Sequence, residues 1–170
     1  MTTHSFTRSL ERSQRPEVEL FWQKFYRQVF GEALLFAKQV ANHTPAQLLG
    51  QDRVVQLASG QTLYVDEKLR EKAYDDFLFE YVSDDRTQSP GWIEKALPID
   101  FVAYAFFASR TAYLFPWPLL QQVWRVNKIE WLARYPQRSA KNTHYNSLFV
   151  AVPLVEVRQA LSEGMKVEVK

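Results

Sequence analysis

Apolar side chains recur at the three- and four-residue spacing of an amphipathic helix between Pro16 and Gly31. Proline suits the first turn of a helix and glycine suits its end, so a helix is predicted there. Residues 32–40 are predicted to form a second helical stretch. It ends before the Asn-His-Thr-Pro run at residues 42–45, because proline restricts the backbone of the residue before it.

Two runs rich in β-branched and aliphatic residues follow at residues 53–57 and 62–65. The Ala-Ser-Gly-Gln sequence between them, residues 58–61, is typical of a turn, so the two runs predict a β-hairpin. An aromatic and aliphatic run at residues 77–82 predicts a buried strand beside this hairpin.

The second half of the chain continues the alternation of strands and helices. Further strands are predicted at residues 101–107, 113–115 and 147–152, although the first of these runs could also be a short buried helix. Helices are predicted at residues 119–135 and 154–161. Together the elements predict an α/β fold with a central mixed β-sheet flanked by helices.

A chain of 170 residues fits one domain better than two. We therefore expect a single domain over residues 16–170, preceded by a flexible N-terminal segment of residues 1–15. The N-terminus lacks the apolar core of a signal peptide, and the longest apolar runs are too short to cross a bilayer. With no cysteine in the chain, these features predict a soluble cytoplasmic protein that does not associate with a membrane.

Charge is distributed unevenly along the chain, although the formal net charge is only +2. Residues 75–100 carry seven acidic and two basic side chains, a balance of −5. Residues 110–141 carry six basic side chains and one acidic side chain, a balance of +5. This asymmetry would suit a phosphate-facing surface beside an acidic one, but solvated faces of opposite sign would explain it equally well.

The hairpin carries the candidate chemistry. Asp66 and Lys68 are two residues apart on a predicted strand, so their side chains share one face while Glu67 lies on the other. Folding at the turn brings Asp52, at the start of the first strand, alongside Asp66. Two adjacent carboxylates repel each other, and magnesium (Mg²⁺) or manganese (Mn²⁺) would relieve the repulsion by taking oxygen ligands from both.

This combination of Gln51-Asp52, a hairpin and Asp66-Glu67-Lys68 resembles the PD-(D/E)XK nuclease superfamily, with Gln51 where the motif has proline. The resemblance covers residues 50–82 and implies a restriction-endonuclease-like fold. It implies that Asp52 and Asp66 are metal ligands, that the backbone carbonyl of Glu67 is a further ligand, and that Lys68 orients the attacking water. The implied activity is Mg²⁺-dependent hydrolysis of phosphodiester bonds, with DNA as the expected substrate.

Two other readings of the same residues stay open. In a catalytically inactive relative that binds nucleic acid or a protein partner, Asp52, Asp66 and Lys68 would form a salt-bridged cluster. A purely structural or inhibitory role is the third reading. The sequence lacks both the His-Glu-x-x-His motif and a glycine-rich phosphate loop, which disfavours zinc hydrolases and nucleoside triphosphatases.

Three further acids are candidates for the site. Glu67 would qualify if the strand contained a bulge, and Glu32 could be the acid that some relatives place on their first helix. Glu80 lies in the middle of an apolar run and needs a partner if it is buried. It is either a third acid of the metal site or one half of a structural ion pair with a nearby base, the candidates being Arg53, Arg70 and Lys72.

Four basic side chains are candidates for contact with the phosphates of a nucleic acid. Arg70 and Lys72 follow the motif directly, whereas Arg125 and Lys128 lie on the predicted helix at residues 119–135. Ordinary surface charge would account for each of them separately. A homodimer would suit cleavage of two strands, but no segment of the sequence identifies an interface.

Overall fold

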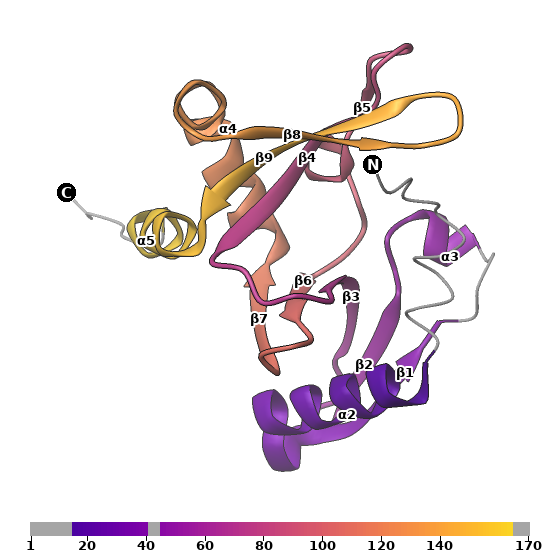
Figure 1. Ribbon diagram of the computed structural model, residues 1–170. Helices are drawn as coiled ribbons and strands as arrows, with labels where there is room; N and C mark the ends of the chain where they lie inside the picture. Colours follow the sequence, from indigo (N-terminus) through magenta and orange to yellow (C-terminus); the bar gives the residue numbers. More distant parts are fainter. Residues whose placement is uncertain (1–14, 41–44, 165–170) are drawn as a thin grey trace. The chain divides into compact units, whose positions relative to one another are not determined.

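The chain folds into two compact units in the computed structural model, which describes residues 15–40 and 45–164 (Figure 1). The motif unit comprises the described residues up to Ala73 together with Leu97–Trp117. The second unit comprises Tyr74–Ala96 and the described residues from Pro118 onward. Residues 1–14 of the predicted flexible segment lie outside the described residues.

The motif unit is built on a five-stranded mixed sheet in the order β1-β2-β3-β6-β7. Its strands β1, β2 and β3 are successive antiparallel neighbours, β3 and β6 are parallel, and β6 and β7 are antiparallel. The bounds are β1 Leu34–Gln39, β2 Arg53–Leu57, β3 Thr62–Arg70, β6 Phe101–Phe106 and β7 Thr111–Pro116.

Helix α2, Pro16–Phe30, supplies one side of the core of the motif unit. Its buried residues Val18, Phe21, Trp22 and Tyr26 recur at helical spacing, so they form one stripe that packs against the sheet. Alternate residues of the strands, among them Leu63 and Val65 of β3, pack against this stripe. The 3₁₀ turn η1, Gly31–Ala33, leads from α2 into β1, and the short helix α3, Pro45–Leu48, precedes β2.

The second unit has its own sheet and an aromatic core. Its four strands run in the order β5-β4-β9-β8, with β4 Asp76–Asp84, β5 Ser89–Pro90, β8 Gln137–Lys141 and β9 Asn146–Pro153. Phe79 of β4 stacks on Trp124 of helix α4, Trp117–Arg134, with ring centroids 5.1 Å apart. The 3₁₀ turn η2, Trp92–Glu94, and helix α5, Leu154–Gly164, complete the unit.

The predicted α/β class with a mixed sheet is confirmed. The structure also confirms the first helix, the hairpin, the three later strands and the two later helices, with bounds that differ by a few residues. Strand β8 was not predicted, because its sequence Gln-Arg-Ser-Ala-Lys is polar and largely exposed. Two compact units can be parts of one domain, so the single domain over residues 16–170 stays a prediction.

The second helix predicted at residues 32–40 is wrong, because this segment is η1 followed by strand β1. A register shift between Leu34 and Phe36, of the kind a β-bulge produces, interrupts its pairing with β2. As a result the two buried residues of the strand, Leu34 and Ala37, are three positions apart. That spacing is typical of a helix, and it explains the wrong prediction.

The position predicted for residues 77–82 is also wrong. The segment is a strand, as expected, but β4 pairs with β5 and β9 in the second unit. The place beside the hairpin is taken by β6, which pairs with β3 in parallel. Among the described helices, none is both long enough and apolar enough to cross a lipid bilayer.

Gly91 gives a test of the packing in the second unit, because its backbone lies directly against that of β4. A Cβ atom at this position would overlap the carbonyl of Glu80. We expect Gly91→Ala to lower the free energy of unfolding by about 2–4 kcal/mol in urea titrations. Gly60→Ala is the control, since its Cβ would point into open space and only the φ of +87° opposes it. An equal loss in both variants would contradict the close approach at Gly91.

Candidate active site at the hairpin

Asp52 and Asp66 meet at the open end of the hairpin. Arg53, the first residue of β2, is the register partner of Val65 on β3. Asp52, just before Arg53, therefore lies opposite Asp66, just after Val65. The backbone confirms this arrangement, because Asp52 N donates to the carbonyl of Val65 at 3.0 Å. The side chain continues the ladder, since Asp52 Oδ2 accepts a hydrogen bond from Glu67 N at 2.9 Å. The carboxyl groups of Asp52 and Asp66 are within hydrogen-bonding contact.

Lys68 joins this pair from the same strand. Its Nζ lies 2.7 Å from Asp66 Oδ1, and its side chain is about one-third exposed whereas that of Asp66 is buried. Strand alternation puts the two side chains on one face. The structure therefore brings together Asp52, Asp66 and Lys68, the three residues that the sequence singled out.

The second oxygen of Asp66, Oδ2, is buried and accepts no hydrogen bond from any residue that the structure describes. It lies beside Gly50, where an added Cβ would come within 3.6 Å of it. Burial and the neighbouring charge of Asp66 raise the pKa of Asp52 to about 8, although the ammonium of Lys68 opposes the shift. At neutral pH the carboxyl group of Asp52 is therefore largely protonated.

The donor set of this pair fits a hard divalent cation. It offers carboxylate oxygens only, including one buried oxygen that lacks a donor, and Mg²⁺ and Mn²⁺ prefer such ligands. The described residues contain no group of three or more acidic, histidine or cysteine side chains that could hold a metal. A cation at this pair would therefore take its remaining ligands from backbone carbonyls, water or a substrate.

Glu67 lies on the opposite face of β3. Its Oε1 accepts hydrogen bonds from Arg53 Nε at 2.5 Å and from Tyr26 Oη at 2.9 Å. The register between β3 and β6 runs without interruption from Val65 to Arg70, so there is no bulge to turn Glu67 toward Asp66. The condition under which Glu67 would join the site is not met.

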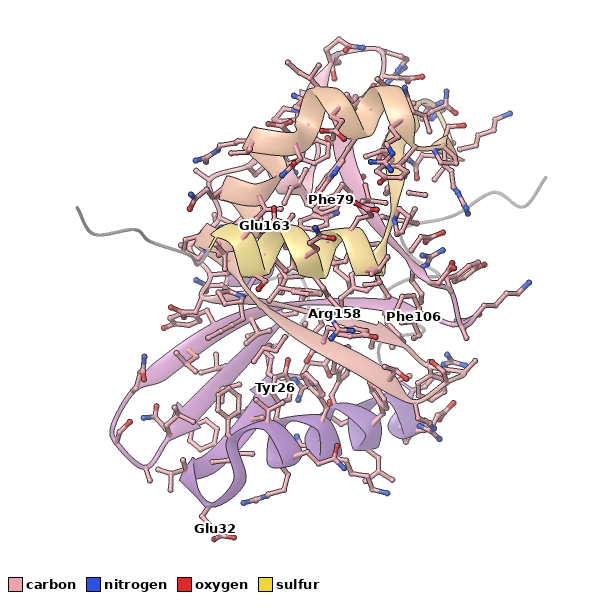
Figure 2. All side chains as sticks on the ribbon, turned by 90° about the vertical axis from the view of Figure 1, so that its left-hand side faces the viewer. Tyr26, Glu32, Phe79, Phe106, Arg158 and Glu163 are labelled. Atoms are coloured by element: carbon pink, nitrogen blue, oxygen red, sulfur yellow. The ribbon has the colours of Figure 1, made fainter. Side chains whose placement is uncertain are left out.

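Glu80 and Glu32 lie in other parts of the structure, Glu80 in the second unit and Glu32 before β1. Glu80 belongs to the sheet of the second unit, and its Oε2 accepts a hydrogen bond from Trp92 N at 3.2 Å. A backbone amide thus supplies the partner that this acid needs. Glu32 is exposed in η1, next to the turn end of the hairpin, and its side chain points away from the sheet (Figure 2).

The four basic candidates are divided between the units. Arg70 follows Lys68 on the same face of β3 and lies 5.8 Å from the centre of the Phe106 ring, and Lys72 is exposed just after the strand. Arg125 and Lys128 are on α4 at the second unit. Arg125 is exposed, whereas Lys128 Nζ is 2.6 Å from a carboxylate oxygen of Glu94.

A buried ion cluster that was not predicted from the sequence lies behind the carboxyl pair. Arg53 is fully buried and lies between Glu19 and Glu67. Its hydrogen bonds lower the pKa of Glu19, whereas burial raises the pKa of Glu67 against the attraction of Arg53. A signal was present, because Arg53 alternates with the core residue Val55, and an arginine facing a core requires acidic partners.

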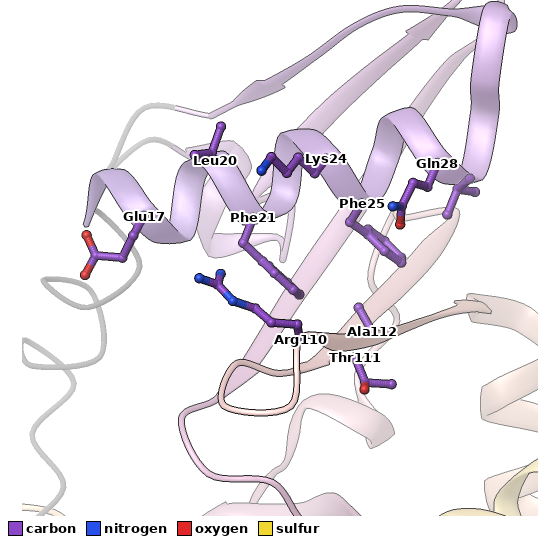
Figure 3. Close-up of a pocket in the computed structure, with 10 residues that line it drawn as sticks. Glu17, Leu20, Phe21, Lys24, Phe25, Gln28, Arg110, Thr111 and Ala112 are labelled. Atoms are coloured by element: carbon purple, nitrogen blue, oxygen red, sulfur yellow. The ribbon is translucent and has the colours of Figure 1, made fainter.

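A groove in the motif unit contains none of the predicted site residues. It lies between α2 and the start of β7, where Phe21 and Phe25 face Arg110 and Ala112 (Figure 3). Half of its lining residues are apolar, and the polar half includes a single acid, Glu17. This groove therefore adds no candidate chemistry to that of the hairpin.

The chain matches no protein-family model, no curated protein and no solved structure.

The proton on Asp52 makes the stability of the fold depend on pH. Because the pKa of Asp52 is about 8 in the folded state and 3.8 in a free side chain, the protonated carboxyl stabilises the fold fully below pH 4. This stabilisation is lost as the pH rises through 8. Asp52→Asn, measured with a chelator present, should melt close to wild type at pH 4. At pH 9 it should melt several degrees higher, equivalent to about 1–3 kcal/mol.

The exposed Asp75 supplies the matched control, because Asp75→Asn removes one negative charge from outside the pair. Melting curves from pH 4 to 9 for the three proteins make the comparison. A difference between Asp52→Asn and wild type that stays constant with pH would show that the pKa of Asp52 is not raised in the folded state.

Proposed function

We propose that this protein is a Mg²⁺-dependent nuclease that hydrolyses phosphodiester bonds in DNA, and that its motif unit is a restriction-endonuclease-like domain. The observation that carries the proposal is the convergence of Asp52, Asp66 and Lys68 at the open end of one hairpin. The carboxyl groups are in contact, which is close enough for one cation to bind both. A buried oxygen without a donor among the described residues adds a reason for a cation to bind there.

The architecture of the motif unit supports the same proposal. A helix precedes the hairpin, and the strand that carries Asp66 and Lys68 is central in a mixed sheet, with further strands on either side. This order is compatible with the PD-(D/E)XK resemblance of residues 50–82. A central strand also gives its side chains a rigid backbone, which a catalytic geometry needs.

The two carboxyl groups and Lys68 have different tasks in this proposal. Asp52 and Asp66 would hold the cation, and Asp52 must first release its proton, because carboxylate ligands bind metals in the ionised form. When bound, Mg²⁺ would stabilise charge that develops on the phosphodiester and acidify a water molecule. Lys68 is partly exposed and fixed by Asp66, so its ammonium group can donate hydrogen bonds to the attacking water or to the phosphate.

The ion pair between Lys68 and Asp66 also supports the second candidate function. A catalytically inactive relative that binds nucleic acid or a protein partner would keep Asp52, Asp66 and Lys68 as a salt-bridged cluster. In that case the cluster would serve the fold, and neither Mg²⁺ nor Mn²⁺ would bind to it. Metal-dependent cleavage therefore separates the two functions.

The test is cleavage of supercoiled, linear, single-stranded and branched DNA with Mg²⁺, with Mn²⁺ and with a chelator. We expect metal-dependent cleavage that falls at least about 100-fold in Asp66→Asn and in Lys68→Met, because the first loses a ligand and the second its positioned donor. Asp75→Asn and Lys24→Met, which change exposed residues outside the hairpin, are the controls. Cleavage that survives both hairpin substitutions would refute the mechanism. DNA binding without cleavage would favour the second function.

Phosphate contacts by the motif unit can be tested through the salt dependence of DNA binding. Removing one cation that neutralises a phosphate lowers the slope of log affinity against log salt concentration by about one. We expect this change for Arg70→Ala and for Lys72→Ala in fluorescence anisotropy, with a similar loss of affinity for different DNA sequences. Lys24→Ala, on the exposed side of α2, should leave the slope unchanged. An unchanged slope in all three variants would exclude Arg70 and Lys72 from the interface.

A further inference from the structure

The buried ion cluster lies directly behind the carboxyl pair, on the other face of the same two strands. We call it the arginine cluster and define it as Arg53, Glu67, Glu19 and Tyr26. Arg53 Nη2 lies 2.7 Å from Glu19 Oε2, and Arg53 Nε lies 2.5 Å from Glu67 Oε1. Tyr26 Oη donates to the same oxygen of Glu67 at 2.9 Å.

The arginine cluster joins four elements of the motif unit. Arg53 is on β2, Glu67 is on β3, and Glu19 and Tyr26 are on α2. Arg53 Nη1 also donates to the carbonyl of Ala37 on β1 at 3.3 Å. Because the guanidinium group is planar and rigid, bonds to two carboxylates fix its orientation as well as its position.

Two residues of the arginine cluster are covalent neighbours of the residues of the site. Arg53 follows Asp52, and Glu67 lies between Asp66 and Lys68. The turn at residues 58–61 fixes the separation of β2 and β3 at one end of the hairpin, but the carboxyl pair lies at the other end. The Arg53–Glu67 ion pair is a side-chain bond between β2 and β3 at that open end.

We propose that the arginine cluster positions the carboxyl pair, with Arg53 and Glu67 as positioning residues. They hold β2 and β3 at the separation at which Asp52 contacts Asp66 and accepts the hydrogen bond from Glu67 N. Glu19 acts through Arg53, since it belongs to neither strand. The consequence for catalysis rests on the proposed nuclease function, whereas the geometric effect on the pair does not.

A buried ion cluster is a poor way to stabilise a fold if stability is its only role. Burying an arginine and a carboxylate costs solvation energy that well-packed apolar residues of similar volume avoid, and such replacements are often neutral or stabilising. Apolar packing, however, does not impose a fixed orientation on the side chains or a fixed separation on the two strands. The fork of Arg53 sets a specific separation between two backbones, which a site of two converging carboxylates requires.

The test uses two variants of the full chain that differ in how much of the cluster they remove. Glu19→Gln weakens one end of it from a helix that carries none of the site residues. The triple variant Glu19→Gln, Arg53→Met, Glu67→Gln removes all three charges together and leaves no unpaired ion in the core. Arg27→Met, at an exposed position of the same helix, is the control.

The first readout is hydrogen exchange at the amide of residue 67, which donates to Asp52 Oδ2. We expect exchange to accelerate about tenfold in the triple variant and by a smaller factor in Glu19→Gln. The amide of Leu57, which donates to the Gln61 carbonyl at the turn, should keep its wild-type rate. The second readout is DNA cleavage. In the triple variant, kcat should fall about 10- to 100-fold while KM changes less than about threefold.

The outcomes separate this inference from the proposed function. If wild type cuts no DNA under any condition, the nuclease proposal fails, and the residue 67 amide still decides whether the cluster positions the pair. A folded triple variant with wild-type exchange at residue 67 would overturn the inference. Equal acceleration at residue 67 and at Leu57 would also overturn it, because the cluster would then support only the fold.

Discussion

The register between β2 and β3 decides which side chains of the motif unit meet. With Arg53 opposite Val65, the residues before and after this pair come together as Asp52 and Asp66. A slip of one residue would send Asp66 and Lys68 to the α2 face and Glu67 to the other. Such a slip is unfavourable because Val55, Leu63 and Val65 are all buried on the α2 face, and the strand that shifted would lose this burial.

Both faces of the hairpin's open end are charged, which is unusual for a central strand. On one face, Asp66 is buried beside Asp52 and Lys68, and on the other, Glu67 is buried beside Arg53. Buried charged side chains are usually paired with an opposite charge. Here Arg53 pairs with Glu67 across two strands, and Lys68 pairs with Asp66 on the same strand. The sheet therefore carries two separate ionic clusters that share a backbone.

The sequence predicted the carboxyl pair because the signal was local. Period-two alternation assigns Asp66 and Lys68 to one face, and a four-residue turn brings Asp52 alongside, so no long-range contact had to be known. The arginine cluster was harder to predict because its members come from α2, β2 and β3. In the sequence, Glu19 and Tyr26 look like ordinary residues of an amphipathic helix. Their contacts with Arg53 depend on how the sheet packs against this helix, which the sequence pattern does not give.

The neighbour of β3 could not be predicted from local pattern either. A parallel pair requires a crossover connection of a dozen or more residues, so the strand that directly follows β3 in the chain need not be its partner. Here the chain leaves the sheet after Arg70, contributes β4 and β5 to the second unit, and returns as β6. A hydrophobic run at residues 77–82 carries no information about which of two sheets it joins.

The two clusters differ in one respect that separates a structural role from a candidate functional one. Every carboxylate oxygen of Glu19 and Glu67 accepts at least one hydrogen bond, from Arg53, Tyr26 or Gln23. In the carboxyl pair, by contrast, Asp66 Oδ2 has no donor among the described residues, and a single ammonium group faces two carboxyl groups. A proton on Asp52 balances this pair at neutral pH, and a divalent cation would balance it when the proton leaves. The arginine cluster has no such deficit, so it can hold the strands in place while the pair exchanges its proton for a ligand.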